Sequence, residues 1–369
     1  MKKTDHKKII ILQDYFLYKG GGERLIITLA KSLKADIVTS FIHQDAFNPR
    51  DYGIKTTELT KQGGFSHIPG FRFLKVQFSF LFKTKFLKNY DIVIYSGDCL
   101  NALRNAKNKI NIAYIHTPPR HLYDNYKLRL SEYKFCKRQI FKIFALVNRI
   151  RFKCLTKKMN LLIANSKTVQ ARIKKYLNLN SVVIYPPCDV NRFKWAGQND
   201  YYFSWARLYD VKRVDKIVEA FVKMPNKKLV VASGGPELKK IKKIAKGYDN
   251  IKILGWISDE KLLELLGNCI ATIYIPLRED FGMSPVESMM AGKPTIGVDE
   301  GGIKETIIHK KTGVLLKPDF NINDIINAVK KMTPDIALKM RFDCETRAKL
   351  FSEENFINDM KKAIEKIIK

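Results

Sequence analysis

Residues 271–298 read ATIYIPLREDFGMSPVESMMAGKPTIGV, and this stretch decides the fold class. Two apolar runs, at 271–276 and 295–298, flank a stretch at 285–291 that begins with Pro and is followed by Gly. Apolar runs without alternation are typical of parallel strands that are buried on both faces. The spacing predicts a strand, a loop over 277–283, a helix and a second strand, which is one unit of a parallel α/β sheet.

The same alternation of short apolar runs and helical patterns fills most of the 369 residues. Strands are expected in two series, at 8–12, 36–41, 91–96, 111–116, 161–166 and 181–187, and then at 201–206, 228–233, 251–256, 271–276, 295–298 and 313–316. Helices are expected between them, including 22–34, 212–223, 236–247 and 259–267. Two such series predict an α/β protein with two Rossmann-like, doubly wound domains.

A polar segment with two prolines, PPCDVNRFKWAGQND at 186–200, separates the two series. Pro, Gly and polar residues between periodic segments are typical of a linker. We therefore expect one domain over 1–192 and a second over 193–351. An amphipathic helix over 352–369 should follow, with Ser352 as its N-cap.

The composition limits the class of protein. The six cysteines are scattered without a CxxC pair, which indicates free thiols in a reducing cytosol and no zinc site. No apolar run reaches 18 residues and the start lacks a signal-peptide core, so neither a membrane span nor a secretory signal is expected. The net charge of +31 attracts anions, which include nucleic acid, anionic lipid and phosphorylated substrates.

Two glutamates, Glu279 and Glu287, frame the loop and helix start of the opening stretch. Ser284 to Glu287 has the form of a capping box with Pro at the first helical position, so Glu287 either caps its own helix or faces a ligand. Gly282 and the helix start present N–H groups that suit an anion. Glu279 has no capping role, and its carboxylate suits the hydroxyls of a sugar.

Three further segments place polar residues at expected strand ends. Gly21 and Gly22 lie in GGGER, which either brings backbone close to a phosphate or is a flexible connection. Arg207 and Lys212, in SWARLYDVK, either clamp a diphosphate or belong to a solvated helix start. His116, in YIHTPPR, lies either in a cleft or in the core.

Together, and in this order along the chain, these segments resemble the family-4 retaining glycosyltransferases. The resemblance implies the GT-B architecture, with two facing Rossmann-like domains. The HTPPR form is most similar to bacterial surface-polysaccharide transferases, many of which use GDP-mannose. The motifs that carry the resemblance are GGGER, YIHTPPR, ANS at 164–166, IYPPCDVNRF at 184–193, SWARLYDVKRVD, GGPE at 234–237, EDFGMSPVESMMAGKPTIG and GGIKETI at 301–307.

The resemblance implies a role for each matching residue of the C-terminal domain. Glu279 corresponds to the first Glu of the family's E-x7-E motif, which contacts hydroxyls of the donor sugar. Glu287 corresponds to the second, which holds the nucleotide ribose. Arg207 and Lys212 correspond to the pair that neutralises the donor diphosphate. Ser204-Trp205-Ala206 departs from the Gly-containing turn that is common before this Arg.

The resemblance also implies contacts from the N-terminal domain and from the backbone. Gly21 and Gly22 correspond to the loop that approaches the diphosphate, and His116 to a histidine near the C6 hydroxyl of the sugar. The remaining expected donor-binding positions are Phe281, Gly282 and Met283, through their N–H groups, and Ser284 at the helix start.

The function that the resemblance implies is retaining transfer of a hexose from a nucleotide sugar. Mannose from GDP-mannose is the first expectation for the donor and a UDP-sugar is the alternative. The acceptor, bound by the N-terminal domain, is lipid-linked or a polysaccharide of the cell surface. The helix over 352–369 should cross back to that domain. No cofactor or metal is expected, since the chain has no Asp-x-Asp motif and Arg207 and Lys212 supply positive charge.

Two stretches that are both basic and apolar indicate where in the cell the protein lies. Residues 71–88 hold six Phe and five basic residues without an acid, and 127–158 hold eleven basic residues and one acid. They predict a cytoplasmic protein that lies peripherally on the anionic inner face of the membrane. The alternative is that the Phe residues are core and the lysines solvated. A nucleic-acid-binding protein is the rival of another class, but no such binding motif occurs, so no nucleic-acid partner is expected.

Overall fold

The computed structural model describes residues 7–61, 63 and 69–368. The chain divides into two compact units, which are treated separately below. The N-terminal unit comprises Met1–Tyr185 and Phe356–Lys369, and the C-terminal unit comprises Pro186–Asn355. The linker expected from the sequence, 186–200, thus begins at the unit boundary.

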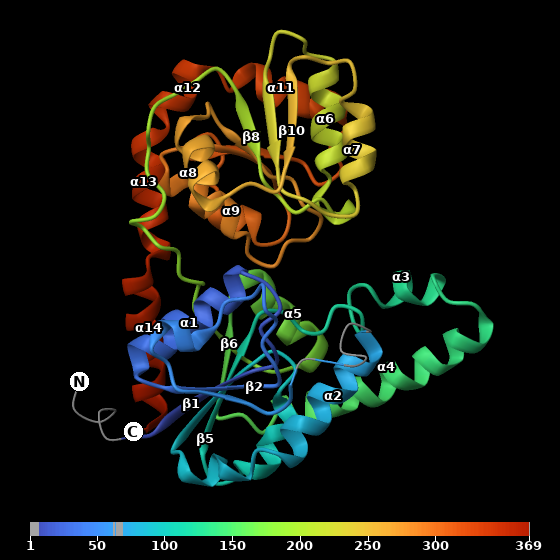
Figure 1. Cartoon of the computed structure of the whole chain (residues 1–369), viewed down its shortest axis with the longest axis vertical. Helices are drawn as coiled ribbons and strands as arrows, with labels where there is room; N and C mark the ends of the chain where they lie inside the picture. Colours follow the sequence, from blue (N-terminus) through green and yellow to red (C-terminus); the bar gives the residue numbers. More distant parts are fainter. Residues whose placement is uncertain (1–6, 62, 64–68, 369) are drawn as a thin grey trace. The chain divides into compact units, whose positions relative to one another are not determined.

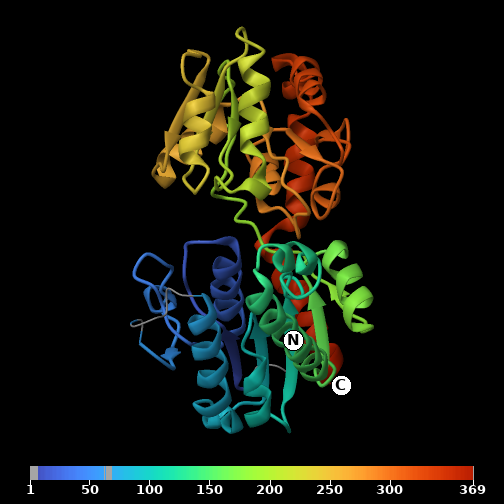
Figure 2. The same cartoon turned by 90° about the vertical axis from the view of Figure 1, so that its right-hand side faces the viewer.

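The N-terminal unit is built on a seven-stranded parallel sheet with the order β3-β2-β1-β4-β5-β6-β7. Its strands are β1 Ile9–Gln13, β2 Asp36–Thr39, β3 Thr56–Glu58, β4 Ile92–Ser96, β5 Ile110–Ile115, β6 Leu161–Ala164 and β7 Val182–Val183. Its helices are α1 Gly21–Leu33, α2 Pro69–Phe82, α3 Tyr126–Ser131, α4 Phe135–Thr156, α5 Lys167–Leu177 and most of α14 Glu353–Ile368. Helices lie on both sides of the sheet (Figures 1 and 2).

Alternating side chains of these strands enter two separate cores. Ile9 and Ile11 of β1 pack on one face with α1 and with Phe356 and Met360 of α14. Ile10, with Leu12 and other residues of the opposite face, packs against α2, α4 and α5. Burial on both faces explains why these strands are apolar throughout.

The C-terminal unit is built on a six-stranded parallel sheet with the order β10-β9-β8-β11-β12-β13. Its strands are β8 Tyr202–Ser204, β9 Leu229–Ala232, β10 Ile251–Gly255, β11 Thr272–Ile273, β12 Thr295–Val298 and β13 Gly313–Leu316. Its helices are α6 Val214–Val222, α7 Leu238–Ile244, α8 Asp259–Asn268, α9 Met283–Met290, α10 Ile303–Thr306, α11 Ile322–Lys331, α12 Pro334–Lys339 and α13 Arg341–Ala348.

The prediction of two Rossmann-like, doubly wound sheets is confirmed. In each sheet the strand order reverses once, between β1 and β4 in the N-terminal unit and between β8 and β11 in the C-terminal unit. Ligands of open α/β sheets bind at the carboxyl ends of the strands beside such a switch point. These two places are therefore where the candidate sites should lie.

The helix expected to return to the N-terminal unit does so. Phe356, Met360 and Ile364 of α14 are buried in the core of that unit. Ser352 caps the helix as predicted, because its Oγ accepts a hydrogen bond from the N–H of Asn355 at 3.2 Å. The helix therefore ties the end of the chain to the first sheet.

Helices α3 and α4 form an arm of the N-terminal unit that extends away from its sheet (Figure 1). The first three turns of α4 contribute no buried residue, and burial begins at Ala145. Within the described part of the chain, no helix has both the length and the hydropathy needed to cross a bilayer.

Candidate active site

Lys212 and Glu279 meet at the switch point of the C-terminal unit. Lys212 ends a short 3-10 helix, Asp210–Lys212, in the loop that follows β8, and Glu279 lies in the loop that follows β11. Lys212 Nζ lies 2.7 Å from Glu279 Oε2 and donates a second hydrogen bond of 2.8 Å to the hydroxyl of Tyr274. The topology thus brings together two residues that are 67 positions apart in the chain.

The ion pair is partly shielded from water but reachable by a ligand. The side chains of Lys212 and Glu279 are 21% and 23% exposed. Burial, together with the nearby charge of Glu279, holds the pKa of Tyr274 well above its ordinary value, so this hydroxyl stays protonated. The arrangement offers a carboxylate that can accept hydrogen bonds beside a cation that can meet a phosphate.

Helix α9 begins at Met283, so the predicted capping box at Ser284 is wrong. The N-cap is Gly282, and no side chain caps the helix. Gly282 has φ +93°, a left-handed conformation that favours glycine, and this turn starts the helix earlier than the sequence predicts. Pro285 costs no helical hydrogen bond in the first turn, because N–H groups there have no partner within the helix.

The start of α9 leaves backbone N–H groups without a side-chain cap, as an anion site requires. Phe281 is buried just before it, and Glu287 lies one turn into the helix, half-buried. Gly292 ends the helix in a left-handed conformation, with φ +66°, as predicted.

Two glycines hold the loop that carries Glu279. The N–H of Gly302 donates to the carbonyl oxygen of Glu279 at 2.9 Å. A Cβ at Gly301 would lie 2.2 Å from that same oxygen, and Gly301 has φ +61°. The motif GGIKETI therefore serves to let two backbone segments approach closely at the site.

Arg207 lies in the same loop as Lys212, half-buried. The loop is fastened to the end of β9, since the N–H of Leu208 donates to the carbonyl oxygen of Gly234 at 3.0 Å. A Cβ at Gly235 would lie 2.4 Å from the carbonyl oxygen of Leu208. The GGPE motif is thus explained by close packing against this loop.

In the N-terminal unit, Gly22 and His116 lie together. A Cβ on Gly22 would lie 3.6 Å from Cε1 of His116, and Gly21 is the first residue of α1, which no side chain caps. Nε2 of His116 is 3.0 Å from the hydroxyl of Ser96. Removal from water lowers the pKa of His116 to about 4, so the imidazole is neutral near pH 7.

The structure therefore groups the predicted residues within each unit. Lys212 and Glu279 form one cluster beside the start of α9, and Gly22 and His116 form another. Their roles toward a donor stay predictions. Tyr274 was not predicted as a site residue, although it lies near the end of the predicted strand 271–276 that leads into the site loop.

Two carboxyl groups at the switch point of the N-terminal unit were also missed. Asp14 directly follows β1, and Asp98 follows β4. Both occupy the strand-end position that singled out His116 in the sequence, so the same signal could have found them.

Comparison with known proteins bears on the family and the fold. Residues 188–351 match the family Glycosyl transferases group 1. The chain is 23% identical to the mouse alpha-1,3/1,6-mannosyltransferase ALG2 over 403 aligned positions, which cover 95% of this chain and 94% of that enzyme. It is 41% identical to ALG2 of Dictyostelium discoideum over 101 residues, and this match spans only 27% of the chain and 24% of that enzyme.

Among solved structures, the chain is similar to Anabaena HepE in complex with UDP and glucose. The TM-score is 0.76 at 18% identity, and the superposition covers 98% of this chain and all of that one. This likeness supports the fold of both units. Residues 188–351 thus carry the match to the group 1 glycosyl transferases, and the chain is a glycosyltransferase of family-4 type with the GT-B fold.

Proposed function

We propose that this enzyme transfers mannose from GDP-mannose, with retention of configuration, to a lipid-linked acceptor in the synthesis of a cell-surface glycan. The observation that carries the proposal is the Lys212–Glu279 pair at 2.7 Å beside the uncapped start of α9. A nucleotide sugar combines a diphosphate with neutral hydroxyls. The cluster offers a partner for each, at the place where α/β sheets bind ligands.

The chemistry requires charge stabilisation on the departing diphosphate. Lys212, Arg207 and the N-terminus of α9 supply positive charge, which makes a metal unnecessary in the proposed mechanism. Glu279 holds hydroxyls of the sugar as positive charge develops at the anomeric carbon, and Glu287 holds the ribose. Gly21, Gly22 and His116 act on the donor as the family resemblance implies.

The carboxylates of the cluster support retention without a covalent intermediate. A retaining hydrolase uses a pair of carboxyl groups about 5 Å apart, one of them as nucleophile. Here Glu279 is already held by Lys212, which disfavours a nucleophilic role. We therefore propose attack of the acceptor hydroxyl on the face that the diphosphate leaves, with the departing phosphate taking the proton.

The choice of mannose rests on the relatives named ALG2, which are alpha-mannosyltransferases. A UDP-sugar is the second candidate donor, favoured by the similar fold of HepE in complex with UDP and glucose. Family membership favours an enzyme over the rival class, a nucleic-acid-binding protein.

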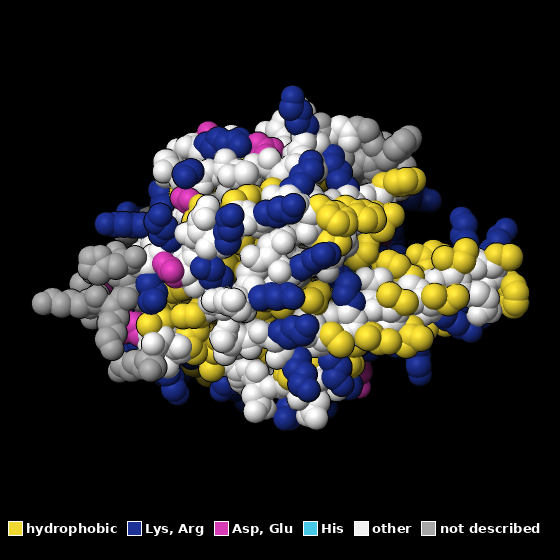
Figure 3. All heavy atoms as spheres, turned by 90° about the horizontal axis from the view of Figure 1, so that it is seen from below, with side chains coloured by type: hydrophobic (Ala, Val, Ile, Leu, Met, Phe, Trp, Pro, Cys, Tyr) yellow, Lys and Arg dark blue, Asp and Glu magenta, His cyan; other side chains and the backbone are white. Residues whose placement is uncertain are grey.

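The proposed location is the anionic cytoplasmic face of a membrane. Apolar side chains of α4, including Ile140, Ile143, Leu146 and Ile150, are exposed in the arm of the N-terminal unit. Figure 3 shows apolar side chains running along this arm, with Lys and Arg beside them and few acids. Exposed apolar surface among basic residues suits an anionic lipid surface. These exposed side chains support the membrane surface that the basic stretches predict. The alternative holds for Phe80 of α2, which is buried in the core.

The test is a donor screen with product analysis. Thermal shifts with GDP-, UDP- and ADP-sugars should single out GDP-mannose, and transfer should proceed in EDTA. The anomeric coupling in the product, measured by NMR, should show the configuration of the donor. Preference for a UDP-sugar would replace the donor assignment, and an inverted product would contradict the mechanism.

A further inference from the structure

Tyr274 contacts both charged residues of the Lys212–Glu279 pair, and the sheet fixes its own position. It directly follows β11, and its N–H donates to the carbonyl oxygen of Ile296 in β12 at 2.9 Å. The residue is only 6% exposed. Its hydroxyl group accepts a hydrogen bond from Lys212 Nζ at 2.8 Å and also makes a hydrogen bond with the carboxylate of Glu279. A buried phenol with these two contacts can hold both charged side chains in place.

The loop that carries Lys212 is fastened to the strand end that carries Tyr274. Arg213 donates from Nε and Nη2 to two carbonyl oxygens at this strand end, at 2.6 and 2.9 Å. The N–H of Leu277 donates to the carbonyl oxygen of Val211 at 2.7 Å. These contacts hold the backbone on both sides of Lys212 and do not involve the tyrosine hydroxyl. Loss of that hydroxyl should therefore release the side chain of Lys212 and leave the loop in place.

The ammonium group of Lys212 has three N–H bonds. Two of them are directed at Tyr274 and Glu279. Within the described part of the chain, no hydrogen bond uses the third. Because two fixed bonds determine the orientation of a tetrahedral group, the direction of the third N–H is set before a ligand binds.

The hydroxyl that holds Lys212 is neutral, which leaves the charge of the ammonium group for a ligand. Burial, the charge of Glu279 and the hydrogen bond with it hold the pKa of Tyr274 well above its ordinary value. The hydroxyl therefore stays protonated near pH 7. A further carboxylate in its place would compete with a phosphate for the ammonium group, whereas a phenol accepts one hydrogen bond and adds no negative charge.

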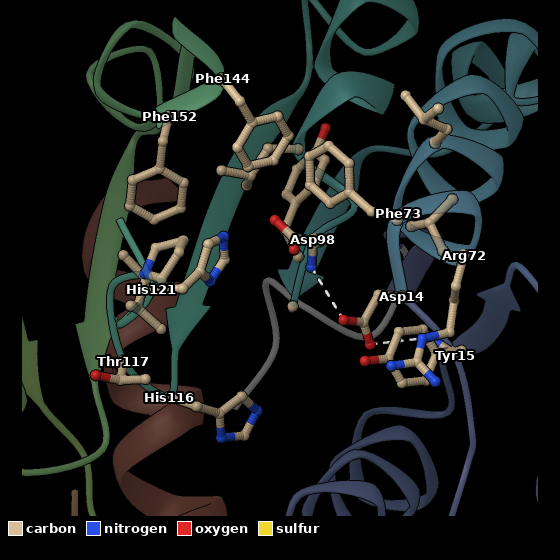
Figure 4. A pocket seen from close by; sticks show the side chains of 18 of the residues that line it. Asp14, Tyr15, Arg72, Phe73, Asp98, His116, Thr117, His121, Phe144 and Phe152 are labelled. Carbon is tan, nitrogen blue, oxygen red and sulfur yellow. Dashed lines mark hydrogen bonds between the residues drawn. The ribbon is translucent and has the colours of Figure 1, made fainter. Parts of the chain in front are cut away.

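The switch point of the N-terminal unit has no comparable cluster. A cavity of about 990 Å³ lies there, between the strand ends and side chains of α2 and α4 that include Phe73 and Phe144 (Figure 4). Its polar groups include two acids, and the N–H of Asp98 donates to Oδ2 of Asp14 at 3.2 Å. Two acids would repel a diphosphate. We therefore expect the oriented cation at Lys212, and not this place, to meet the diphosphate.

We propose that Tyr274 is a positioning residue of the transfer reaction, whose hydroxyl group orients Lys212 so that one N–H meets the departing diphosphate. It acts through Lys212 and needs no contact of its own with the donor. The inference rests on the proposed function and deepens it, because it states how the cation is held while Glu279 binds the sugar. When sugar hydroxyls engage the carboxylate of Glu279, the bond to Tyr274 keeps the ammonium group in place.

The test is a double-mutant cycle on kcat/KM for GDP-mannose. Tyr274→Phe keeps the buried ring and removes only the hydroxyl group, so kcat/KM should fall about tenfold, as expected for one hydrogen bond to a charged group. Lys212→Gln removes the cation. Because Tyr274 acts through Lys212, adding Tyr274→Phe to Lys212→Gln should cause no further loss. A tenfold loss in both backgrounds, or in neither, would overturn the proposal.

The same cycle is measured on GDP binding by calorimetry, which needs no turnover. Tyr274→Phe should weaken GDP binding about tenfold in the wild-type background and leave it unchanged in the Lys212→Gln background. UDP replaces GDP if the donor screen selects a UDP-sugar, because the proposal concerns the diphosphate that both nucleotides share. A folded Tyr274→Phe variant that binds the nucleotide as wild type does would show that the hydroxyl does not direct Lys212 at the diphosphate.

The matched control is Tyr202→Phe. Tyr202 lies in the same unit and is fully buried, and its hydroxyl group donates to the carbonyl oxygen of Met332 at 2.7 Å. Both variants lose a buried hydrogen bond, so both should lower the melting temperature, but Tyr202→Phe should leave kcat/KM and GDP binding unchanged. Equal kinetic losses in the two variants would mean that general destabilisation, and not the orientation of Lys212, explains the effect of Tyr274→Phe.

The outcome can be separated from that of the donor screen. Nucleotide binding together with additive effects of Tyr274→Phe and Lys212→Gln would contradict the role of Tyr274 and leave the proposed function standing. Absence of GDP and UDP binding, together with absence of transfer from any nucleotide sugar, would contradict the proposed function itself.

Discussion

The two switch points of this enzyme share a topology and differ in charge. In the C-terminal unit, the loops after β8 and β11 bring Lys212 and Glu279 to 2.7 Å. In the N-terminal unit, the segments after β1 and β4 bring together two acids, Asp14 and Asp98. The first place pairs opposite charges beside a helix start, and the second places like charges against an apolar wall.

Under the proposed function, the difference reflects how a shared topology takes on different chemistry at its two switch points. The strand order fixes where a ligand binds, and the few residues after each strand decide its chemistry. A cation beside a carboxylate suits a diphosphate that carries a sugar. Two acids beside an apolar wall do not suit a diphosphate, because like charges repel. Variants at the two places should therefore have different effects.

The largest effect is expected from Glu279→Gln. The amide keeps the shape but loses the charge that faces the developing cation, so kcat/KM for transfer should fall about 10²- to 10³-fold. The matched control is Glu345→Gln, which breaks the 2.8 Å pair with Arg341 elsewhere in the same unit. It should transfer normally. Normal turnover in Glu279→Gln, with folding checked by circular dichroism, would contradict the assignment.

The sequence alone is sufficient to predict the two sheets and the residues that meet in the Lys212–Glu279 cluster, apart from Tyr274. Apolar runs reveal buried parallel strands, and the GGGER and EDFGMSP motifs mark strand ends. The features that the sequence does not predict depend on contacts between residues far apart in the chain. The start of α9 depends on the conformation of Gly282, whose neighbour Ile303 is 21 positions away. The cavity joins α2 and α4, whose facing Phe73 and Phe144 have no shared local pattern.

A pair of glycine variants compares the rigidity of the two places. Gly301→Ala would put a Cβ 2.2 Å from the backbone oxygen of Glu279, and Gly97→Ala would put one 2.4 Å from Cγ of Asp14. Both glycines have positive φ, so both variants should be destabilised. Gly301→Ala should lose more free energy of unfolding, about 3 kcal/mol. Its added Cβ meets backbone, which cannot move aside as the side chain of Asp14 can.

The measurement for this pair is thermal denaturation together with transfer activity. Gly301→Ala should also lose activity, since it displaces the loop that carries Glu279. Gly53→Ala is the control, because Gly53 has φ +73° but nothing within 4 Å of an added Cβ. Equal losses of stability in Gly53→Ala and Gly301→Ala would show that the positive φ alone causes the loss. The close contact between Gly301 and Glu279 would then contribute nothing.

The acid pair predicts a pH dependence for the N-terminal unit. The pKa of Asp14 rises from 3.8 to about 7 on folding, so the folded state binds this proton more tightly. The free energy of unfolding therefore falls as the pH rises from about 4 to about 7. The full shift corresponds to ~4 kcal/mol, and we expect about half of it because Asp14 is not fully enclosed.

Asp14→Asn removes this titration. The difference in melting temperature, variant minus wild type, should therefore rise by roughly 5 °C from pH 5 to pH 8. This rise is expected whatever the difference is at pH 5. Asp45→Asn, on the surface of the same unit, should follow wild type at both values. A wild-type curve that runs parallel to that of Asp14→Asn would show that Asp14 is already ionised at pH 5.

The smallest expected effect concerns the surfaces of the two units. Phe135 at the start of α4 and Phe342 in α13 are equally exposed, at 76% each, but only Phe135 lies on the basic arm. Phe135→Ser should reduce binding to anionic vesicles several-fold in a flotation assay, because one aromatic anchor is lost, and Phe342→Ser should not. Raised salt should weaken binding of the wild type, since the lysines contribute through screened charge. Equal loss in both variants would mean that exposed phenylalanines bind lipid wherever they lie, and the arm would then have no special part in membrane binding.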